Sequence, residues 1–347
     1  MKNRNMIIFT VLCLFLSACS QTDSPAEEQG RNSEFIKGAD ISWVTEMESR
    51  GMQFYNPEGT QLECTALMKE IGFGAIRLRV WVNPEDGWCG KNDVLAKARR
   101  AQDLGMDLMI DFHYSDSWAD PGKQTPPAAW SGYKAEEMAQ AVAAHTKDVL
   151  QTLKDNAINV RWVQVGNEVN QGMLWPMGKV SGQSVGNFVD FLNAGHDAVK
   201  SIYPEAEVIL HVSNGHDSEL FKWFFGLMAA NKAKYDIIGM SIYPIWWENG
   251  GWCYWRPIVD SCISNISLMS SMFSKPVMIC ETGMPIHEPV MARTALEYLI
   301  DEAYKIESCM GVFYWEPEAP KGYNGGYEMG AFADGKPTIA LDPVRNK

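Results

Sequence analysis

The stretch Val163-Gln164-Val165-Gly166-Asn167-Glu168 is a strand-like run that ends on a carboxylate, and it decides the fold class of this chain. A second run, Val277-Met278-Ile279-Cys280-Glu281, has the same form. Runs of this kind are typical of strands buried in a parallel sheet. Together with their neighbours, these two and six further runs give predicted strands at residues 35–44, 75–82, 107–115, 160–169, 207–215, 236–244, 276–283 and 311–317.

Amphipathic stretches separate the predicted strands. They have apolar residues at helical i, i+3, i+4 spacing, and the clearest cover residues 94–104, 135–154, 185–202 and 291–306. Eight strands that alternate with helices predict an α/β protein with a single (β/α)8 TIM barrel over residues 33–347. A doubly wound sheet is the competing architecture, but it needs a Gly-rich phosphate loop after the first strand, which the sequence lacks.

The composition is that of a globular protein with a large core: 347 residues, 46% hydrophobic, with a formal net charge of −13. An acidic surface repels polyanions, so we expect a neutral substrate and no nucleic acid or anionic lipid partner. Most of the 13 tryptophans should pack in the core, and those at strand ends are candidates for stacking against a ligand. We expect a monomer that needs no cofactor.

The N-terminus has the features of a targeting segment. Lys2 and Arg4 precede an apolar stretch, residues 6–16, that is too short to span a bilayer. The stretch runs into Leu16-Ser17-Ala18-Cys19, which resembles a bacterial lipobox. The resemblance implies a signal peptide over residues 1–18, a lipid on Cys19 and a flexible tether over residues 19–32. We therefore expect an exported lipoprotein at the outer membrane or surface of a bacterium, touching the membrane through its lipid only. An ordinary secretory signal with a chance cysteine is the alternative.

Export makes disulfides permissible for the six cysteines of the body. Cys253 and Cys262 lie close together in sequence and could pair, and so could Cys64 and Cys89. Cys280 precedes Glu281 on a buried strand, and alternation predicts that its thiol points away from the barrel axis as an inert core group. No pair has the spacing of a zinc site, so no metal is expected.

The two terminal glutamates point to a reaction. In a barrel, strands four and seven face each other across the mouth, so Glu168 and Glu281 can approach to about 5–5.5 Å. This is the separation of the two carboxylates in a retaining glycoside hydrolase, with Glu168 as the protonated acid/base and Glu281 as the ionised nucleophile. For one such glutamate alone, a helix cap or a surface partner would be the simpler interpretation.

Three other side chains are predicted to surround these carboxylates. Asn167 is a neutral donor beside Glu168. Tyr243 ends strand six and is a candidate donor to the nucleophile. Arg77 and Arg79 lie on one face of an otherwise apolar strand, so at least one should sit near the carboxylates, and Arg77 is preferred.

Several polar and aromatic residues at strand ends are predicted to contact sugars. Trp118 and Trp315 are candidate platforms, as are the strand-end aromatics Trp81 and Tyr114. Residues predicted to hydrogen-bond sugar hydroxyls are His113, Asp116 and His211. For His211 a purely structural hydrogen-bonding role is equally favoured, because it is a lone histidine on an apolar strand. The tryptophans at 246, 247, 252 and 255 could line a distal subsite or pack within their loop.

Six segments together resemble glycoside hydrolase family 53, the endo-β-1,4-galactanases that cut the galactan side chains of pectin: residues 77–87, 111–130, 163–168, 241–244, 280–283 and 313–317. The resemblance implies a (β/α)8 barrel and retention of configuration. It implies that Glu168 is the acid/base and Glu281 the nucleophile, with Arg77, Asn167 and Tyr243 around the −1 sugar. It places Trp315 and residues 113–118 at the substrate. The calcium-binding loop that some members carry after strand seven is replaced here by a short segment, residues 282–288.

Two alternatives remain at the level of sequence. One is a retaining enzyme that acts on another neutral β-1,4 glycan, such as mannan, xylan or glucan. The other is a non-catalytic glycan-binding surface lipoprotein, which would be expected to lack one of the two carboxylates. Short loops after strands seven and eight leave the number of distal subsites, and so the product length, open.

Overall fold

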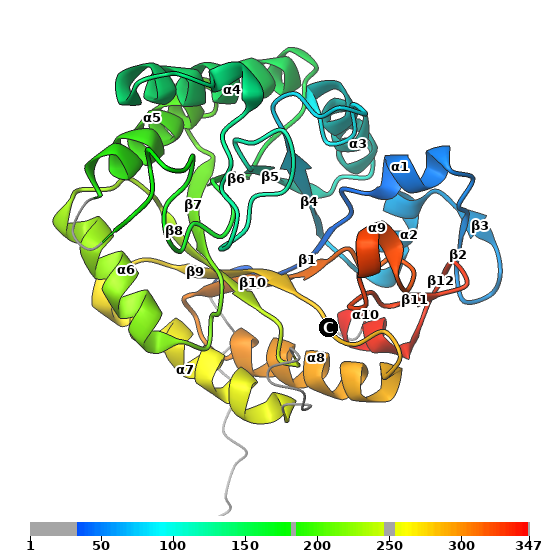
Figure 1. The fold of residues 1–347 in the computed structure, drawn as a ribbon. Coiled ribbons are helices and arrows are strands. Elements are labelled where there is room, and N and C mark those ends of the chain that lie inside the picture. Colours follow the sequence, from blue (N-terminus) through cyan, green and yellow to red (C-terminus); the bar gives the residue numbers. More distant parts are fainter. Residues whose placement is uncertain (1–32, 182–184, 246–253, 346–347) are drawn as a thin grey trace, which may run out of the picture. The chain divides into compact units, whose positions relative to one another are not determined.

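The computed structural model describes residues 33–181, 185–245 and 254–345. Eight parallel strands form a closed barrel in the order β1-β10-β9-β8-β7-β6-β5-β4 (Figure 1). The barrel strands are β1 (Ile36–Asp40), β4 (Ala75–Val80), β5 (Asp107–Phe112), β6 (Trp162–Val165), β7 (Glu207–Val212), β8 (Ile237–Ile242), β9 (Val277–Thr282) and β10 (Cys309–Trp315). The predicted (β/α)8 TIM barrel is confirmed.

Helices surround the barrel (Figure 1). The long ones are α2 (Cys64–Ile71), α3 (Lys91–Asp103), α4 (Ala135–Asp155), α5 (Gly186–Ile202), α6 (Ser218–Ala230), α7 (Trp255–Phe273) and α8 (Pro289–Tyr304). Their ends follow local chemistry: the Glu63 carboxylate caps α2 by accepting from the amides of Thr65 and Ala66, and Gly72 ends it in the left-handed region. Within the part of the chain described here, no helix is long and apolar enough to cross a membrane.

The remaining elements are short and lie in the loops. They are α1 (Val44–Ser49), a hairpin of β2 (Phe54–Tyr55) and β3 (Gln61–Leu62), η1 (Ala128–Trp130), α9 (Tyr323–Gly326), a hairpin of β11 (Phe332–Ala333) and β12 (Lys336–Pro337), η2 (Ile339–Leu341) and α10 (Asp342–Arg345). Up to Arg345, where the described residues end, the segment after β10 therefore has no long helix, as its lack of periodicity predicts.

The barrel interior is divided into an apolar and a polar layer. The apolar layer takes residues from all eight strands: Ile36, Ala75, Met109, Trp162, Ile209, Ile237, Met278, Cys280 and Phe313. Gly38 makes room for it, since a Cβ there would lie 2.2 Å from the Phe313 ring. Two residues further along several strands, the inward side chains are polar, among them Arg77, Asp111 and Gln164, and they form the floor of the site.

The predicted orientation of Cys280 is wrong, because its thiol belongs to the interior layer. The register of β9 explains this. Ile279 pairs with Met240 and Glu281 with Ser241, so β9 has one extra residue against β8. A bulge of this kind breaks strict alternation. It lets both Cys280 and Glu281 face inward.

Neither of the two disulfides that the sequence leaves open is formed by the described cysteines. Cys64, Cys89 and Cys262 are buried free thiols. The Cys89 thiol donates to the Ser42 carbonyl at 3.7 Å, and the Cys262 sulfur packs inward near Gly215. The other member of the second pair, Cys253, lies outside the described residues.

Candidate active site

Glu281 is held by two donors. Its Oε1 lies 2.8 Å from Arg77 Nη2, and its Oε2 accepts a hydrogen bond from the Tyr243 hydroxyl at 3.0 Å. Burial raises the pKa of Glu281 to about 7, while Arg77 and Tyr243 act in the opposite direction. Burial also raises the pKa of Tyr243, so its hydroxyl keeps the proton that it donates. The two donors therefore favour the ionised form of Glu281, whose charge burial alone would disfavour.

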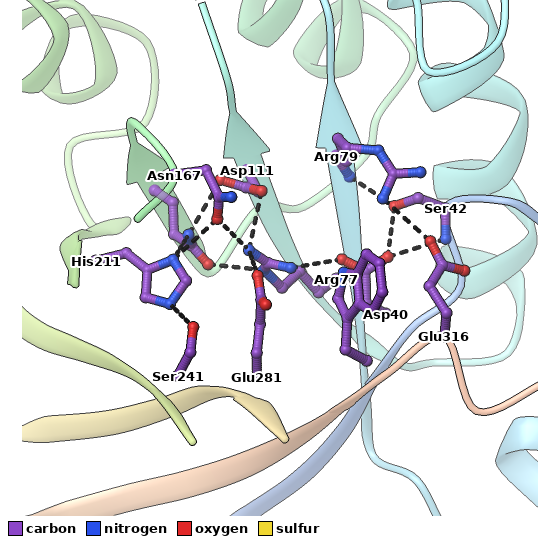
Figure 2. A network of polar contacts seen from close by, with 12 residues as sticks. Asp40, Ser42, Arg77, Arg79, Asp111, Asn167, His211, Ser241, Glu281 and Glu316 are labelled. Atoms are coloured by element: carbon purple, nitrogen blue, oxygen red, sulfur yellow. Dashed lines mark hydrogen bonds and ion pairs between the residues drawn. The ribbon is translucent and has the colours of Figure 1, made fainter. Parts of the chain in front are cut away.

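Arg77 organises the floor beneath this carboxylate (Figure 2). Its guanidinium contacts Asp40 at 2.7 Å, Asp111 at 2.9 Å and the Gln164 amide oxygen at 2.7 Å, in addition to Glu281. One cation thus faces three buried carboxylates. The excess of negative charge favours protonation of a further carboxyl group nearby.

Glu168 follows β6 in an uncommon backbone conformation, with φ of 44°. The turn begins at Gly166 (φ 89°), where a Cβ would lie 2.6 Å from a Val169 methyl group. Burial, and then the charge of Glu281, raises the pKa of Glu168 to about 8. Glu168 is therefore protonated at neutral pH, which suits a general acid.

Both glutamates line one cavity of about 310 Å³. The predicted site residues that line it with them are His113, Trp118, Asn167, Tyr243 and Trp315. The cavity also includes residues that the sequence analysis did not single out, namely Ala119, Asp120, Gly326, Tyr327, Glu328 and Met329. Three other predicted residues, Arg77, His211 and Asp116, are not among the residues that line this cavity.

His211 belongs to the buried polar network and lies between Asn167 and Ser241 (Figure 2). It is fully buried, with Nδ1 at 3.0 Å from Asn167 Oδ1 and 2.9 Å from Gln164 Nε2, and Nε2 at 2.7 Å from Ser241 Oγ. Burial lowers its pKa, so the ring is neutral. These contacts make it a structural hydrogen-bonding group that positions Asn167, whose own amide nitrogen donates to the Ala119 carbonyl at 2.8 Å.

His113 lines the cavity, but protein groups engage both of its ring nitrogens. Nδ1 accepts from the Ala119 amide at 3.1 Å and from the Trp81 indole at 3.4 Å, so Nε2 bears the hydrogen and donates to Asp111 at 3.0 Å. Burial opposes the charge on Asp111, yet Arg77 and His113 hold its pKa at about 2. The histidine thus presents its ring to the cavity and its polar atoms to the protein.

Tyr114 and Asp116 do not reach the cavity. Tyr114 is buried on the outward side of its strand, stacked on Phe112 at 5.5 Å with its hydroxyl 2.8 Å from Thr146 Oγ1. The expected stacking face at Tyr114 is therefore wrong, because alternation turns it toward the helices. Asp116 lines a neighbouring hollow and accepts from the amides of Asn83 at 3.0 Å and Ala128 at 2.8 Å.

Comparison with known proteins decides the family. The model described as glycosyl hydrolase family 53 matches residues 36–336. The chain belongs to glycosyl hydrolase family 53. It is therefore a glycoside hydrolase, and the expectation of this family is confirmed.

The relatives of this family 53 hydrolase come from bacteria and fungi. It is 35% identical over 261 residues to a Niallia circulans protein described as "Uncharacterized protein in bgaB 5'region", covering 74% of this chain and 69% of the relative. It is 29% identical over 320 residues to the endo-beta-1,4-galactanase of Bacillus subtilis, covering 83% and 71%. It is 30% identical over 305 residues to a probable arabinogalactan endo-beta-1,4-galactanase A of Aspergillus terreus, covering 81% and 85%.

Solved structures agree with this assignment. A fungal beta-1,4-galactanase superposes with a TM-score of 0.82 at 25% identity, covering 91% of this chain and all of the other. The family 53 catalytic domain of Ignisphaera aggregans superposes with a TM-score of 0.79 at 25% identity, covering 90% and 96%.

Parts of this family 53 site were not singled out in the sequence, although some gave a signal. Asp40 ends β1 as Glu281 nearly ends β9, and Gln164 is a polar residue inside an apolar strand. Both patterns mark inward polar groups in a barrel. The wall formed by Tyr327, Glu328 and Met329 comes from the irregular segment after β10, which has no periodic pattern to place it.

Proposed function

We propose that this hydrolase is a retaining endo-β-1,4-galactanase that cuts the galactan side chains of pectin. The observation that carries the proposal is the pair Glu168 and Glu281, which line one cavity and of which Glu281 alone is held by both Arg77 and Tyr243. The names of the Bacillus and Aspergillus relatives support galactan as the substrate.

In the first step, a Glu281 oxygen attacks the anomeric carbon of the sugar while the bond to the leaving sugar oxygen breaks. Glu168 gives its proton to that oxygen. The products are a covalent galactosyl ester on Glu281 and a free sugar chain. Arg77 and Tyr243 keep the nucleophile oriented through its two oxygens.

In the second step, Glu168 takes a proton from water, which attacks the anomeric carbon and releases Glu281. The change of role follows from charge. The negative charge of Glu281 is one cause of the raised pKa of Glu168, and esterification removes that charge. The pKa of Glu168 then falls, and the residue becomes a base.

Trp118 and Trp315 are the candidate sugar platforms. Their ring centroids lie 5.9 Å apart at an interplanar angle of 66°, so they form a corner of the cavity. Rings of this kind stack on the apolar face of a sugar, while Asn167 and Glu281 contact its hydroxyls. The oxygen at C4 is axial in galactose and equatorial in glucose, mannose and xylose. In a β-1,4-linked chain this oxygen is part of the glycosidic bond, so galactan bends differently from the other three glycans. A site that hydrogen-bonds the sugar hydroxyls of the bent chain leaves its polar groups unpaired with the others and rejects them.

Proton NMR during early hydrolysis tests the mechanism, since retention gives the β-anomer first. A first-formed α-anomer would show that water attacks directly and would exclude Glu281 as the nucleophile. A panel of linear galactan, mannan, xylan and cellulose tests the substrate, and we expect internal cuts in galactan with little action on the rest. Comparable rates on galactan and mannan would contradict galactan specificity and leave the carboxylate pair intact.

We also propose that the enzyme is a monomeric, lipid-anchored protein outside the cytoplasm. The support is the sequence around Cys19, which lies outside the described residues. Cys19→Ser should abolish incorporation of labelled fatty acid and leave galactan hydrolysis by the soluble protein unchanged. Labelling that persists in the variant would contradict the lipobox.

A further inference from the structure

Gln124 is a buried polar residue that the mechanism described above does not use. It lies in the loop after β5, where its neighbours Lys123 and Thr125 are exposed, whereas Gln124 itself is only 2% exposed. A glutamine is mostly found at the surface, and a buried one has its amide group hydrogen-bonded. The partners of this amide therefore show which part of the protein Gln124 holds.

The side-chain amide of Gln124 joins two segments of the wall of the catalytic cavity. Its Nε2 donates to the carbonyl of Asn167 at 2.9 Å and to the carbonyl of Asp120 at 3.1 Å. Both partners are backbone carbonyl oxygens, which only accept, so the amide nitrogen faces them and uses both of its hydrogens. Asp120, Asn167 and Glu168 line the cavity, whereas Gln124 is not among the lining residues. Gln124 therefore acts on the cavity through the loops after β5 and β6.

The Asn167 carbonyl belongs to the peptide group that joins Asn167 to Glu168. The orientation of this peptide relative to the Glu168 side chain is set by φ of Glu168, which is 44° and lies in the left-handed region. A residue other than glycine is held there at a cost, and it stays there only where surrounding contacts fix the backbone. The hydrogen bond from Gln124 fixes the peptide, and with it the direction in which the Glu168 side chain leaves the backbone.

The backbone of Gln124 is itself anchored. Its carbonyl accepts from the Trp175 amide at 2.7 Å, so the loop after β6 also holds the glutamine in place. A further hydrogen bond joins the same two loops, since the Asn167 side-chain nitrogen donates to the Ala119 carbonyl at 2.8 Å. Asn167 is thus held at its side chain by Ala119 and at its own carbonyl by Gln124. Groups held in this way keep a productive geometry without reorganisation.

We infer that Gln124 is a positioning residue for the general acid, and that it holds the peptide before Glu168 so that the protonated carboxyl group reaches the leaving sugar oxygen. The inference rests on the proposed role of Glu168. Proton transfer needs hydrogen-bond contact, and a misplacement of ~1 Å in an active site can cost ~10²-fold in rate. Without the Gln124 donor, the peptide can turn and the carboxyl group moves away from that oxygen. Glu281 keeps its position, because its contacts come from other residues.

The test compares kcat/KM of the wild type, Gln124→Met and Gln124→Glu on aryl glycosides of β-1,4-galactobiose whose leaving groups range from good to poor. A good leaving group departs without a proton, so its kcat/KM does not depend on the acid. Gln124→Met keeps the length of the side chain and removes the donor, so it should lose about 10–100-fold on the poorest leaving group and less than about twofold on the best one. In Gln124→Glu, burial beside two carbonyl groups keeps the carboxyl group protonated, and it can donate to one of them. This variant should lie between the wild type and Gln124→Met.

Gln102→Met is the matched control. The Gln102 side chain also holds a backbone group near β6, since its Oε1 accepts from the Asn159 amide at 2.8 Å, but Asn159 precedes β6 and lies at the opposite end of that strand from Glu168. The control should keep the wild-type dependence on the leaving group, and unaltered cleavage of the best substrate by Gln124→Met shows that this variant is folded. Equal losses on all leaving groups in Gln124→Met, or no loss on any, would overturn the inference. A wild type that cleaves neither galactan nor the aryl galactobiosides would instead overturn the proposed function.

Discussion

Tyr243→Phe removes the hydroxyl group that faces Glu281, the proposed nucleophile, and leaves the tyrosine ring in place. That hydroxyl donates to Glu281 Oε2 at 3.0 Å. A hydrogen bond to a charged group contributes ~1.5–3 kcal/mol. Since one pKa unit corresponds to ~1.36 kcal/mol, the pKa of Glu281 should rise by about one to two units in the variant.

The direction of the activity change follows from the role of Glu281. The nucleophile acts in its ionised form, so activity falls as pH drops through its pKa. A higher pKa therefore moves the acidic limb of the kcat/KM profile to higher pH. The basic limb reports loss of the Glu168 proton, near its pKa of about 8, and should move less. Because a rise of one to two units from about 7 brings the pKa of Glu281 up to or past that of Glu168, the bell-shaped profile narrows from its acidic side and its maximum falls.

The measurement is the pH dependence of kcat/KM on linear galactan for wild type and Tyr243→Phe. Tyr114→Phe is the matched control, because Tyr114 is a buried tyrosine whose hydroxyl contacts Thr146 at 2.8 Å, away from the cavity. The control should keep both limbs in place. An acidic limb that stays fixed, or moves to lower pH, in Tyr243→Phe would refute the idea that this hydroxyl stabilises the ionised nucleophile.

Two further predictions concern the charged groups. Glu168→Ala should slow hydrolysis of galactan by about 10²–10⁴-fold, and should slow hydrolysis of an aryl galactoside with a good leaving group much less. Azide should restore turnover of the variant and give a β-galactosyl azide. Equal losses on both substrates would contradict the role of Glu168 as the acid. Arg77→Met should destabilise the fold by ~3–5 kcal/mol in denaturant unfolding, because it leaves buried carboxylates unpaired. Arg293→Met is its control, since that arginine is 45% exposed and 3.8 Å from Asp342, and it should cost less than ~1 kcal/mol.

The sequence predicts where the barrel strands begin better than where they end. The third predicted strand, 107–115, becomes β5 (Asp107–Phe112), and the fourth, 160–169, becomes β6 (Trp162–Val165). The difference lies at the C-terminal ends. Tyr114 and Gly166 have φ of 49° and 89°, so the chain turns out of the ladder while its residues remain buried. Hydrophobic periodicity records burial, and burial extends past the last ladder hydrogen bond.

Alternation along a strand predicts which face of the sheet each side chain is on, but it does not predict which residue of another strand that side chain contacts. It correctly puts Arg77 and Arg79 on one inward face, yet the two arginines serve different sites. Arg77 pairs with Glu281, whereas Arg79 pairs with Glu316 and lies under Trp118. The partners come from strands and loops that are distant in sequence, so only the closed barrel brings them together. The same limit explains why His211, a lone polar residue on β7, could not be assigned to one role.

The position of Glu281, the proposed nucleophile, depends on a backbone irregularity that strict alternation does not predict. Strict alternation along β9 would turn either Cys280 or Glu281 outward. The extra residue in β9 lets Cys280 fill the apolar layer while Glu281 reaches Arg77 and Tyr243 above it. A one-residue change of register here would move the carboxylate to the opposite face. The chemistry of the site therefore rests on the backbone irregularity as much as on the glutamate itself.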